Sequence, residues 1–226
     1  MGNLLPLRAA ALETRTFALA GRFRWLRVWY CAEPAIALLL AIALAPVAVA
    51  LGLAIAILSR RSPLVRHRRV GWRGEELPVL KFRTMWPADA PGRTSLWAIE
   101  ELPEVNHFDK APGDERIASP FAAWCRRHSL DELPQLVHII SGTMSFVGPR
   151  PITRAELETF YGDDAMEVLS LRPGLTGLWQ VLGRNHLTYS QRRRLDLFLV
   201  RRASPALFAV ILARTIPQIL RSRGAF

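Results

Sequence analysis

The longest run of apolar positions in the sequence covers residues 35–58, and no charged residue interrupts it. A helix of about 20 apolar residues crosses the hydrocarbon core of a bilayer, so this run is long enough for one spanning helix. Pro46 lies in the middle of the run, where it cannot donate a hydrogen bond and leaves the carbonyl of Ile42 without its helical partner. The pattern therefore predicts either one spanning helix or two half-helices that enter the bilayer and return to the same face.

Arginines flank this segment on both sides. They are Arg22, Arg24 and Arg27 before it, and Arg60, Arg61, Arg66, Arg68 and Arg69 after it. Because positive residues prefer the cytoplasmic side, both ends favour one side, and the charges together with Pro46 favour a re-entrant helix-break-helix. A cleaved signal peptide is a third alternative, with a candidate cleavage site at residues 48–50. The apolar run, however, starts at residue 35 and continues past that site to residue 58, which disfavours cleavage.

Other patterns predict short elements around this segment. Residues 4–27 mix apolar side chains with arginines, which is typical of either an interfacial helix or a loosely ordered arm. The turn at residues 71–74, followed by an apolar stretch at 77–82, predicts a short strand pair. Residues 87–112 are rich in Pro, Asp and Gly and predict a loop with room for one short helix. Helices are expected at 133–140, ending at Ser141-Gly142, and at 153–161.

The C-terminal pattern is amphipathic. The apolar residues 207–212 continue at helical spacing to Ile216, Ile219 and Leu220, with arginines on other faces. Such a helix either packs in the core or lies on a membrane surface. The sequence thus predicts an α+β, mainly helical chain. It divides into an N-terminal arm (1–34), a re-entrant membrane helix (35–58) and a cytoplasmic catalytic domain (59–226) with short strands and C-terminal interfacial helices.

The composition indicates which classes of molecule the chain binds. Half of the 226 residues are hydrophobic, which is enough for a sizeable core without disulfides. The net charge of +11 is carried almost wholly by arginine, because Lys81 and Lys110 are the only lysines. Guanidinium groups bind phosphates and anionic lipid headgroups. No nucleic-acid-binding motif accompanies the charge, which disfavours nucleic acid as a partner.

An acid pair, Asp131-Glu132, is the first candidate for chemistry. If a helix begins after Asp131, Pro134 falls in its first turn and Asp131 becomes the N-cap. The positive helix end would then lower the pKa of Asp131 and attract a phosphate. An ionised aspartate beside phosphorus can act as a nucleophile, and Glu132 could hold a divalent cation, for which magnesium is the usual choice. Taken alone, the two acids are interpreted more simply as a cap and a first-turn acid.

Four basic turns change this interpretation. Each sets a basic side chain in or beside a Gly or Pro turn, which presents the side chain at low entropic cost. These side chains are Lys81 and Arg83, Arg150, Arg172 and Arg184. With the acid pair and the membrane segment, they predict a polyanionic substrate delivered to lipid.

The order and spacing of these motifs resemble the bacterial sugar transferase family, the monotopic polyprenyl-phosphate phosphoglycosyl transferases. The matching stretches are residues 70–71, 81–85, 129–136, 144–151, 172–181, 183–185 and 214–217. The C-terminal half is similar to the exopolysaccharide branch, which primes repeat-unit synthesis with galactose or glucose phosphate. The resemblance implies a re-entrant helix and a location on the cytoplasmic face of the bacterial inner membrane.

The resemblance also implies a two-step exchange. Asp131 would attack the sugar-bearing phosphorus of a UDP-sugar, UMP would leave, and polyprenyl (undecaprenyl) phosphate would take the phosphosugar. Glu132 matches the acid associated with Mg²⁺. The residues expected to bind phosphate are Lys81, Arg83, Arg126, Arg150, Arg172 and Arg184.

Three positions depart from the family pattern: Ala45 replaces a common Ser before Pro46, Thr143 replaces a frequent Asp, and Leu199 replaces a frequent Tyr. Two rival functions remain. A non-catalytic membrane adaptor would bind anionic lipid or nucleotide-sugar through its arginines alone, and a nucleic-acid-binding membrane protein would bind duplex DNA in a salt-sensitive way. The donor sugar, the glycan pathway and the oligomeric state do not follow from the sequence.

Overall fold

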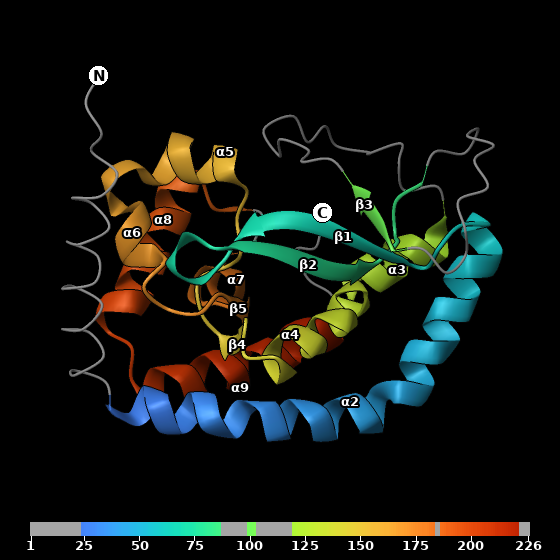
Figure 1. Ribbon diagram of the computed structural model, residues 1–226, viewed down its shortest axis with the longest axis horizontal. Coiled ribbons are helices and arrows are strands. Elements are labelled where there is room, and N and C mark those ends of the chain that lie inside the picture. Colours follow the sequence, from blue (N-terminus) through green and yellow to red (C-terminus); the bar gives the residue numbers. More distant parts are fainter. Residues whose placement is uncertain (1–23, 87–98, 103–118, 184–185, 222–226) are drawn as a thin grey trace.

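The computed structural model describes residues 24–86, 99–102, 119–183 and 186–221 (Figure 1). These residues are mostly helical with a few short strands, which confirms the expected class. The elements are α2 (Arg24–Ser59), β1 (Leu64–Val70), η1 (Trp72–Gly74), β2 (Glu76–Phe82), β3 (Glu100–Leu102), α3 (Pro120–Arg127), η3 (Leu130–Gln135), α4 (Leu136–Ile140), β4 (Ser145–Val147), α5 (Arg154–Glu156), η4 (Leu157–Tyr161), η5 (Gly162–Asp164), α6 (Ala165–Val168), β5 (Gly174–Thr176), α7 (Leu178–Leu182), α8 (Tyr189–Arg201) and α9 (Pro205–Arg221).

Helix α2 contains the expected membrane segment and begins earlier, at Arg24. Among the described residues it is the one helix long and apolar enough to cross a membrane. The helix continues through both Pro34 and Pro46 without a break. In Figure 1 it runs along the lower edge of the molecule and turns upward towards its C-terminal end. A proline that removes a helical hydrogen bond produces a bend of this kind.

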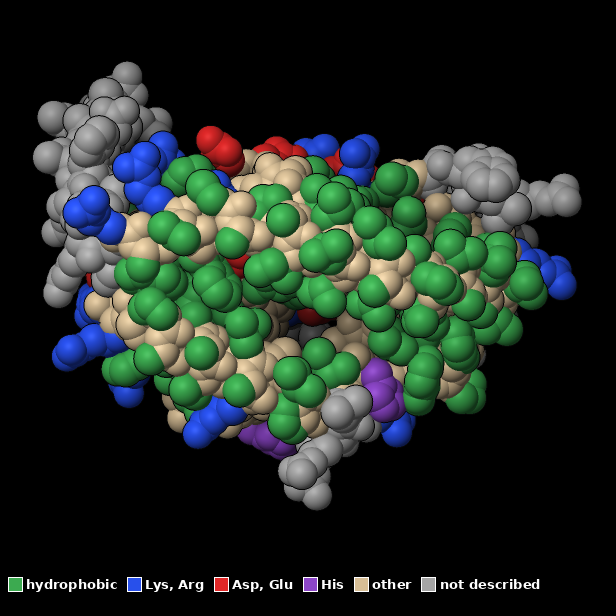
Figure 2. All heavy atoms as spheres, turned by 90° about the horizontal axis from the view of Figure 1, so that it is seen from below, with side chains coloured by type: hydrophobic (Ala, Val, Ile, Leu, Met, Phe, Trp, Pro, Cys, Tyr) green, Lys and Arg blue, Asp and Glu red, His purple; other side chains and the backbone are tan. Residues whose placement is uncertain are grey.

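Most large apolar side chains of α2 are exposed, and two on α9 join them. We call this surface the apolar face. Its members are Ile36, Leu38, Leu39, Leu40, Ile42, Val47, Val49, Leu53, Ile57 and Leu58 on α2, with Val210 and Ile216 on α9. Figure 2, a view from below, shows apolar side chains over much of this side of the molecule. Monomeric soluble proteins rarely expose so much contiguous apolar surface, so the face indicates contact with another apolar phase.

A buried carboxylate joins α2 to the rest of the protein. Glu33 is only 1% exposed, although it lies in the apolar helix. Its Oε1 accepts hydrogen bonds from the Ser145 hydroxyl at 2.6 Å and from the Phe146 backbone N–H at 2.7 Å. Both donors belong to β4, so α2 is fixed to the strand that precedes the Gly148-Pro149-Arg150 turn.

The predicted strand pair is confirmed by the β1–β2 hairpin, in which Leu64 lies opposite Phe82 and Val70 opposite Glu76. Strand β3 pairs in parallel with β1, giving the order β2-β1-β3. The expectation of a loop or short helix was wrong at β3. An ion pair between Arg83 and Glu100 at 2.7 Å contributes to holding this short strand. Apart from Ile99, the rest of residues 87–112 lies outside the described residues.

Strands β4 and β5 form a second, two-stranded parallel sheet with very close backbone approach. A Cβ on Gly148 would lie 2.2 Å from the Arg172 carbonyl oxygen, and one on Gly174 would lie 2.1 Å from the Gly148 nitrogen. Because all these neighbours are backbone atoms, only glycine fits at either position. The contact fixes the start of the turn that carries Arg150.

The expected C-terminal and central helices are present. On α9, Phe208 and Ile211 are buried while Val210 and Ile216 are exposed, so the helix contributes to both the core and the apolar face. Helix α4 ends at Ile140 and is followed by Ser141 and Gly142, as expected. The φ of Gly142 is +75°. The helix predicted at 153–161 forms as α5 and η4, after a capping box between Thr153 and Glu156. The N-terminal arm lies mostly outside the described residues.

Candidate active site

Asp131 and Glu132 lie in η3, which begins at Leu130. The prediction that Asp131 is an N-cap was therefore wrong. Ser129, with a left-handed φ of 57°, occupies the cap position and makes no side-chain cap. The reason is the tighter 3₁₀ winding of this turn. It starts at Leu130, so Asp131 already lies inside its first turn, and Pro134, which has no N–H, leaves the Asp131 carbonyl without an i→i−3 donor.

Glu132 is the centre of an ion-pair cluster. Its Oε1 accepts hydrogen bonds from Lys81 Nζ at 2.9 Å and from Arg150 Nη2 at 3.0 Å. Burial alone would raise the pKa of Glu132, but the two positive charges and their hydrogen bonds outweigh it and lower the pKa to about 2. Glu132 is therefore ionised at neutral pH. Because both of these hydrogen bonds go to Oε1, the second oxygen, Oε2, is left to bind a ligand.

Burial has the largest effect on the pKa of Asp131. This residue is 8% exposed, and the desolvation raises its pKa to about 6, with the Glu132 charge acting in the same direction. The charges of Lys81, Arg126 and Arg150 lower the pKa but do not cancel the desolvation. The expectation of a lowered pKa was thus wrong, because burial outweighs both the cations and the helix end. At pH 7 a group with a pKa of about 6 is still about nine-tenths ionised.

Arg126 lies near the end of α3, a helix that Ser119 caps by accepting the Ala122 N–H at 3.1 Å. The charge of Arg126 acts on Asp131. Its Nε is buried and has no hydrogen-bond partner among the described residues. A buried guanidinium N–H close to a buried carboxylate is a donor that a phosphate oxygen can satisfy. The structure therefore brings together Asp131, Glu132, Lys81, Arg126 and Arg150.

Arg83 is placed elsewhere. Its guanidinium is 2% exposed, donates to the Ser62 carbonyl at 2.8 Å through Nε, and pairs with Glu100 through Nη2 at 2.7 Å. It is not among the charges that act on Asp131. In this arrangement Arg83 holds β3 and the residues before β1 rather than facing the acid pair.

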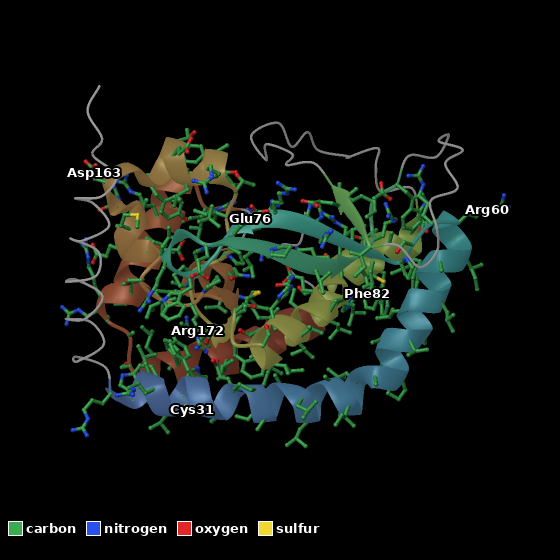
Figure 3. All side chains as sticks on the ribbon, viewed as in Figure 1. Cys31, Arg60, Glu76, Phe82, Asp163 and Arg172 are labelled. Atoms are coloured by element: carbon green, nitrogen blue, oxygen red, sulfur yellow. The ribbon has the colours of Figure 1, made fainter. Side chains whose placement is uncertain are left out.

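Arg172 also lies apart from the acid pair. Its guanidinium is 4.4 Å from the centre of the Tyr30 ring and 5.5 Å from that of Trp72. Figure 3 shows Arg172 below the turn end of the hairpin, above α2, whereas Phe82, next to Lys81, lies at the other end. Arg172 thus stacks between α2 and the hairpin turn. The last predicted phosphate-binding residue, Arg184, lies outside the described residues.

The sequence did not single out His138, which the structure places beside this cluster. His138 lies on α4, is buried, and accepts the Leu80 backbone N–H on its Nε2 at 3.1 Å. The only sequence signal was a lone histidine seven residues after Asp131 in a predicted helix. Nothing in that spacing indicates a bond to the neighbouring strand.

Comparisons with known proteins give a consistent picture. A family model described as bacterial sugar transferase matches residues 27–222. The chain is 41% identical over 162 residues to the exopolysaccharide production protein ExoY of Rhizobium meliloti (strain 1021), covering 71% of each chain. It is 40% identical over 162 residues to the undecaprenyl-phosphate galactose phosphotransferase of Salmonella typhimurium (strain LT2), covering 71% of this chain and 34% of that one. It is 35% identical over 169 residues to the UDP-glucose:undecaprenyl-phosphate glucose-1-phosphate transferase of Xanthomonas campestris pv. campestris, covering 71% and 32%. The chain thus spans about a third of the longer relatives and most of ExoY.

Proposed function

The chain belongs to the bacterial sugar transferase family, and on that basis we propose that it transfers a sugar 1-phosphate from a UDP-sugar to polyprenyl phosphate, releasing UMP. The observation that carries this proposal is the buried carboxylate of Asp131, held beside Glu132 within the charges of Lys81, Arg126 and Arg150. The names of the Salmonella and Xanthomonas relatives support an undecaprenyl phosphate acceptor, and that of the Xanthomonas relative supports a UDP-sugar donor. The ExoY relative supports a role in exopolysaccharide synthesis.

The proposed reaction has two displacements at one phosphorus atom. In the first, an Asp131 oxygen forms a bond to the sugar-bearing phosphorus, and the bond from that phosphorus to the bridging oxygen breaks, so UMP leaves with the electron pair. In the second, an oxygen of the lipid phosphate attacks the same phosphorus and the bond to Asp131 breaks, which restores the carboxylate. The charges of Lys81, Arg126 and Arg150 offset the negative charge that develops on the phosphoryl oxygens and the leaving group.

The site is compatible with Mg²⁺. Among the described residues no group of three or more His, Cys, Asp or Glu side chains could hold a metal by itself. Magnesium, however, is usually bound through one or two carboxylates together with substrate phosphates and water. The ionised Glu132, with Oε2 available, fits such a partial site, and we propose it as the protein ligand. The ion would neutralise pyrophosphate charge when it binds with the donor.

The pKa of Asp131 predicts how the rate of UMP release depends on pH. The carboxylate must be ionised to attack phosphorus, and its pKa is raised to about 6. UMP release under subsaturating donor should therefore be nearly constant above pH 7 and fall towards tenfold per pH unit below about pH 6. Initial rates between pH 5 and 8, in membranes checked for integrity after each incubation, would test this. A flat profile down to pH 5 would exclude an ionised nucleophile with this pKa.

We propose that the apolar face lies in the cytoplasmic leaflet of the bacterial inner membrane, with α2 entering and leaving on one side. The arginines at both ends of the apolar segment support this placement, because they favour one side and attract anionic lipid. Figure 2 shows a hollow near the middle of this side of the molecule, with an acidic side chain visible inside it. An opening on that side would let a lipid phosphate reach the protein from the bilayer.

Introducing charged residues on the apolar face tests whether this face lies in the membrane. Val49 and Leu53 are 61% and 60% exposed on α2, so replacing them does not disturb the core. An aspartate in the hydrocarbon region costs about 2.5–3.5 kcal/mol, so the Val49→Asp/Leu53→Asp double variant should move substantially from the membrane to the soluble fraction. Sedimentation of carbonate-washed membranes measures the distribution, with Val49→Ile/Leu53→Met as the matched apolar control. Equal retention of both variants would contradict contact between this face and lipid.

The donor sugar is tested directly by incubating membranes with a panel of UDP-sugars and polyprenyl phosphate and assaying UMP. The proposal expects release with at least one donor and a dependence on polyprenyl phosphate for turnover. A non-catalytic adaptor would release none with any of them.

A further inference from the structure

One backbone donor on the open edge of β2 is bound by a side chain instead of a strand. Strand β2 is at the edge of its sheet, in the order β2-β1-β3. The Leu80 N–H donates to His138 Nε2 at 3.1 Å, so it points away from β1 and towards α4. His138 therefore occupies the place that a neighbouring strand's carbonyl would take in a wider sheet.

The bond defines which ring nitrogen of His138 carries the proton. Because Nε2 accepts from a backbone amide, it must be unprotonated, and the neutral ring carries its proton on Nδ1. Nδ1 lies 3.5 Å from Thr143 Oγ1, which itself donates to the His138 carbonyl at 3.1 Å. The Thr143 oxygen can thus accept from Nδ1. Burial lowers the pKa of His138, which keeps the ring in this neutral form.

Lys81 follows Leu80 directly, and its Nζ donates to Glu132 Oε1 at 2.9 Å. Glu132 lies on η3, which runs into α4, the helix that carries His138. Two adjacent residues of β2 are therefore tied to one continuous helical segment, Leu80 by its backbone and Lys81 by its side chain. The bond from Leu80 to His138 fixes the position of β2 along the helical segment. The bond from Lys81 to Glu132 can form only when β2 is in that position.

We propose that His138 is a positioning residue that holds the edge of β2 against α4 and thereby keeps Lys81 on Glu132, within the field around Asp131. This inference rests on the proposed function for its activity readout. It adds a residue that does not touch substrate and acts only through Lys81. An apolar side chain of similar size would fill the space but leave the Leu80 N–H without its acceptor.

A double-mutant cycle between His138 and Lys81 tests this mechanism. We expect His138→Leu to lower the kcat of UMP release by tenfold to about a hundredfold, because small misplacements of a charged group have effects of this size. His138→Gln, whose side-chain carbonyl can accept the Leu80 N–H near the position of Nε2, should recover activity to within a few-fold of wild type. In a Lys81→Met background, His138→Leu should produce little further loss, because the group that it positions is already gone.

Two results would overturn the inference. If the effects of His138→Leu and Lys81→Met multiply, His138 does not act through Lys81, and if His138→Gln is as impaired as His138→Leu, the accepted hydrogen bond is not the cause. His138→Met is measured in parallel, so that the cycle can be completed if the leucine variant does not accumulate. Failure of the proposed function is seen separately, since wild-type protein would then release no UMP from any UDP-sugar.

Discussion

Asp131→Asn is expected to lower UMP release by about 10³-fold or more while the protein remains in the membrane fraction. The carboxamide has nearly the same shape as the carboxylate but lacks the charge that attacks phosphorus. The change also removes a buried carboxylate whose pKa is raised by burial. The folded protein should therefore not be destabilised by it. The assay is UMP release from a UDP-sugar with and without polyprenyl phosphate. Radiolabel from the donor's sugar should attach to wild-type protein and not to this variant.

The matched control is Asp163→Asn, the same chemical change at an exposed carboxylate on η5, labelled in Figure 3. It should leave UMP release within about twofold of wild type, as surface substitutions usually have small effects. Release by Asp131→Asn at a rate comparable with this control would remove Asp131 as the nucleophile. A membrane adaptor, which needs the arginines but not the acid, would tolerate both changes equally.

Gly148→Ala should have the second-largest effect, because the new Cβ has no room. It would lie 2.2 Å from the Arg172 carbonyl oxygen, 2.8 Å from the Gly174 nitrogen and 3.1 Å from the Pro173 carbonyl carbon. These are backbone atoms, so β4 and β5 must separate, and we expect a loss of about 3 kcal/mol or more in the free energy of unfolding. Arg150 is two residues away, so any variant that folds should also lose the contact with Glu132. Thermal unfolding in detergent and UMP release measure the two effects.

Gly52→Ala is the corresponding control. Its Cβ would lie 3.6 Å from Phe82 Cε1, an ordinary contact, and the residue is inside α2. Alanine is favoured over glycine in a helix interior by about 1 kcal/mol, so this variant should be at least as stable as wild type. Equal melting temperatures for Gly148→Ala and Gly52→Ala would show that β4 and β5 are not packed as closely as described.

The elements that could be predicted from the sequence are those with a strong local signal. The uninterrupted apolar run gives most of α2, the turn at residues 71–74 gives the β1–β2 hairpin, and the spacing of apolar residues after 207 gives α9. Strand β3 could not be found in this way. Its three residues include two glutamates, and it is held by backbone pairing with β1 and by ion pairs from arginines on neighbouring segments, among them Arg83.

The candidate site was predictable in its members but not in its electrostatics. The sequence indicated that Lys81, Asp131, Glu132 and Arg150 belong together, and the structure places Lys81 and Arg150 on Glu132. The pKa of Asp131 depends on how much water the fold excludes, and no sequence spacing reports that quantity. The same limit applies to Arg83, which shares a motif with Lys81 but pairs with Glu100. The difference between the two is set by a strand pairing distant in the sequence.

The hydrogen bonds of Glu33 to Ser145 and Phe146 have a consequence for how this protein can be handled. The apolar helix α2 is not an interchangeable segment, since it also supplies a carboxylate to the strand that leads into the Arg150 turn. Removing α2 to obtain a water-soluble fragment, or replacing it with an unrelated hydrophobic helix, would leave the Phe146 amide without its acceptor and the Ser145 hydroxyl with the Val147 carbonyl alone. A change to α2 is therefore also a change to the support of the candidate active site.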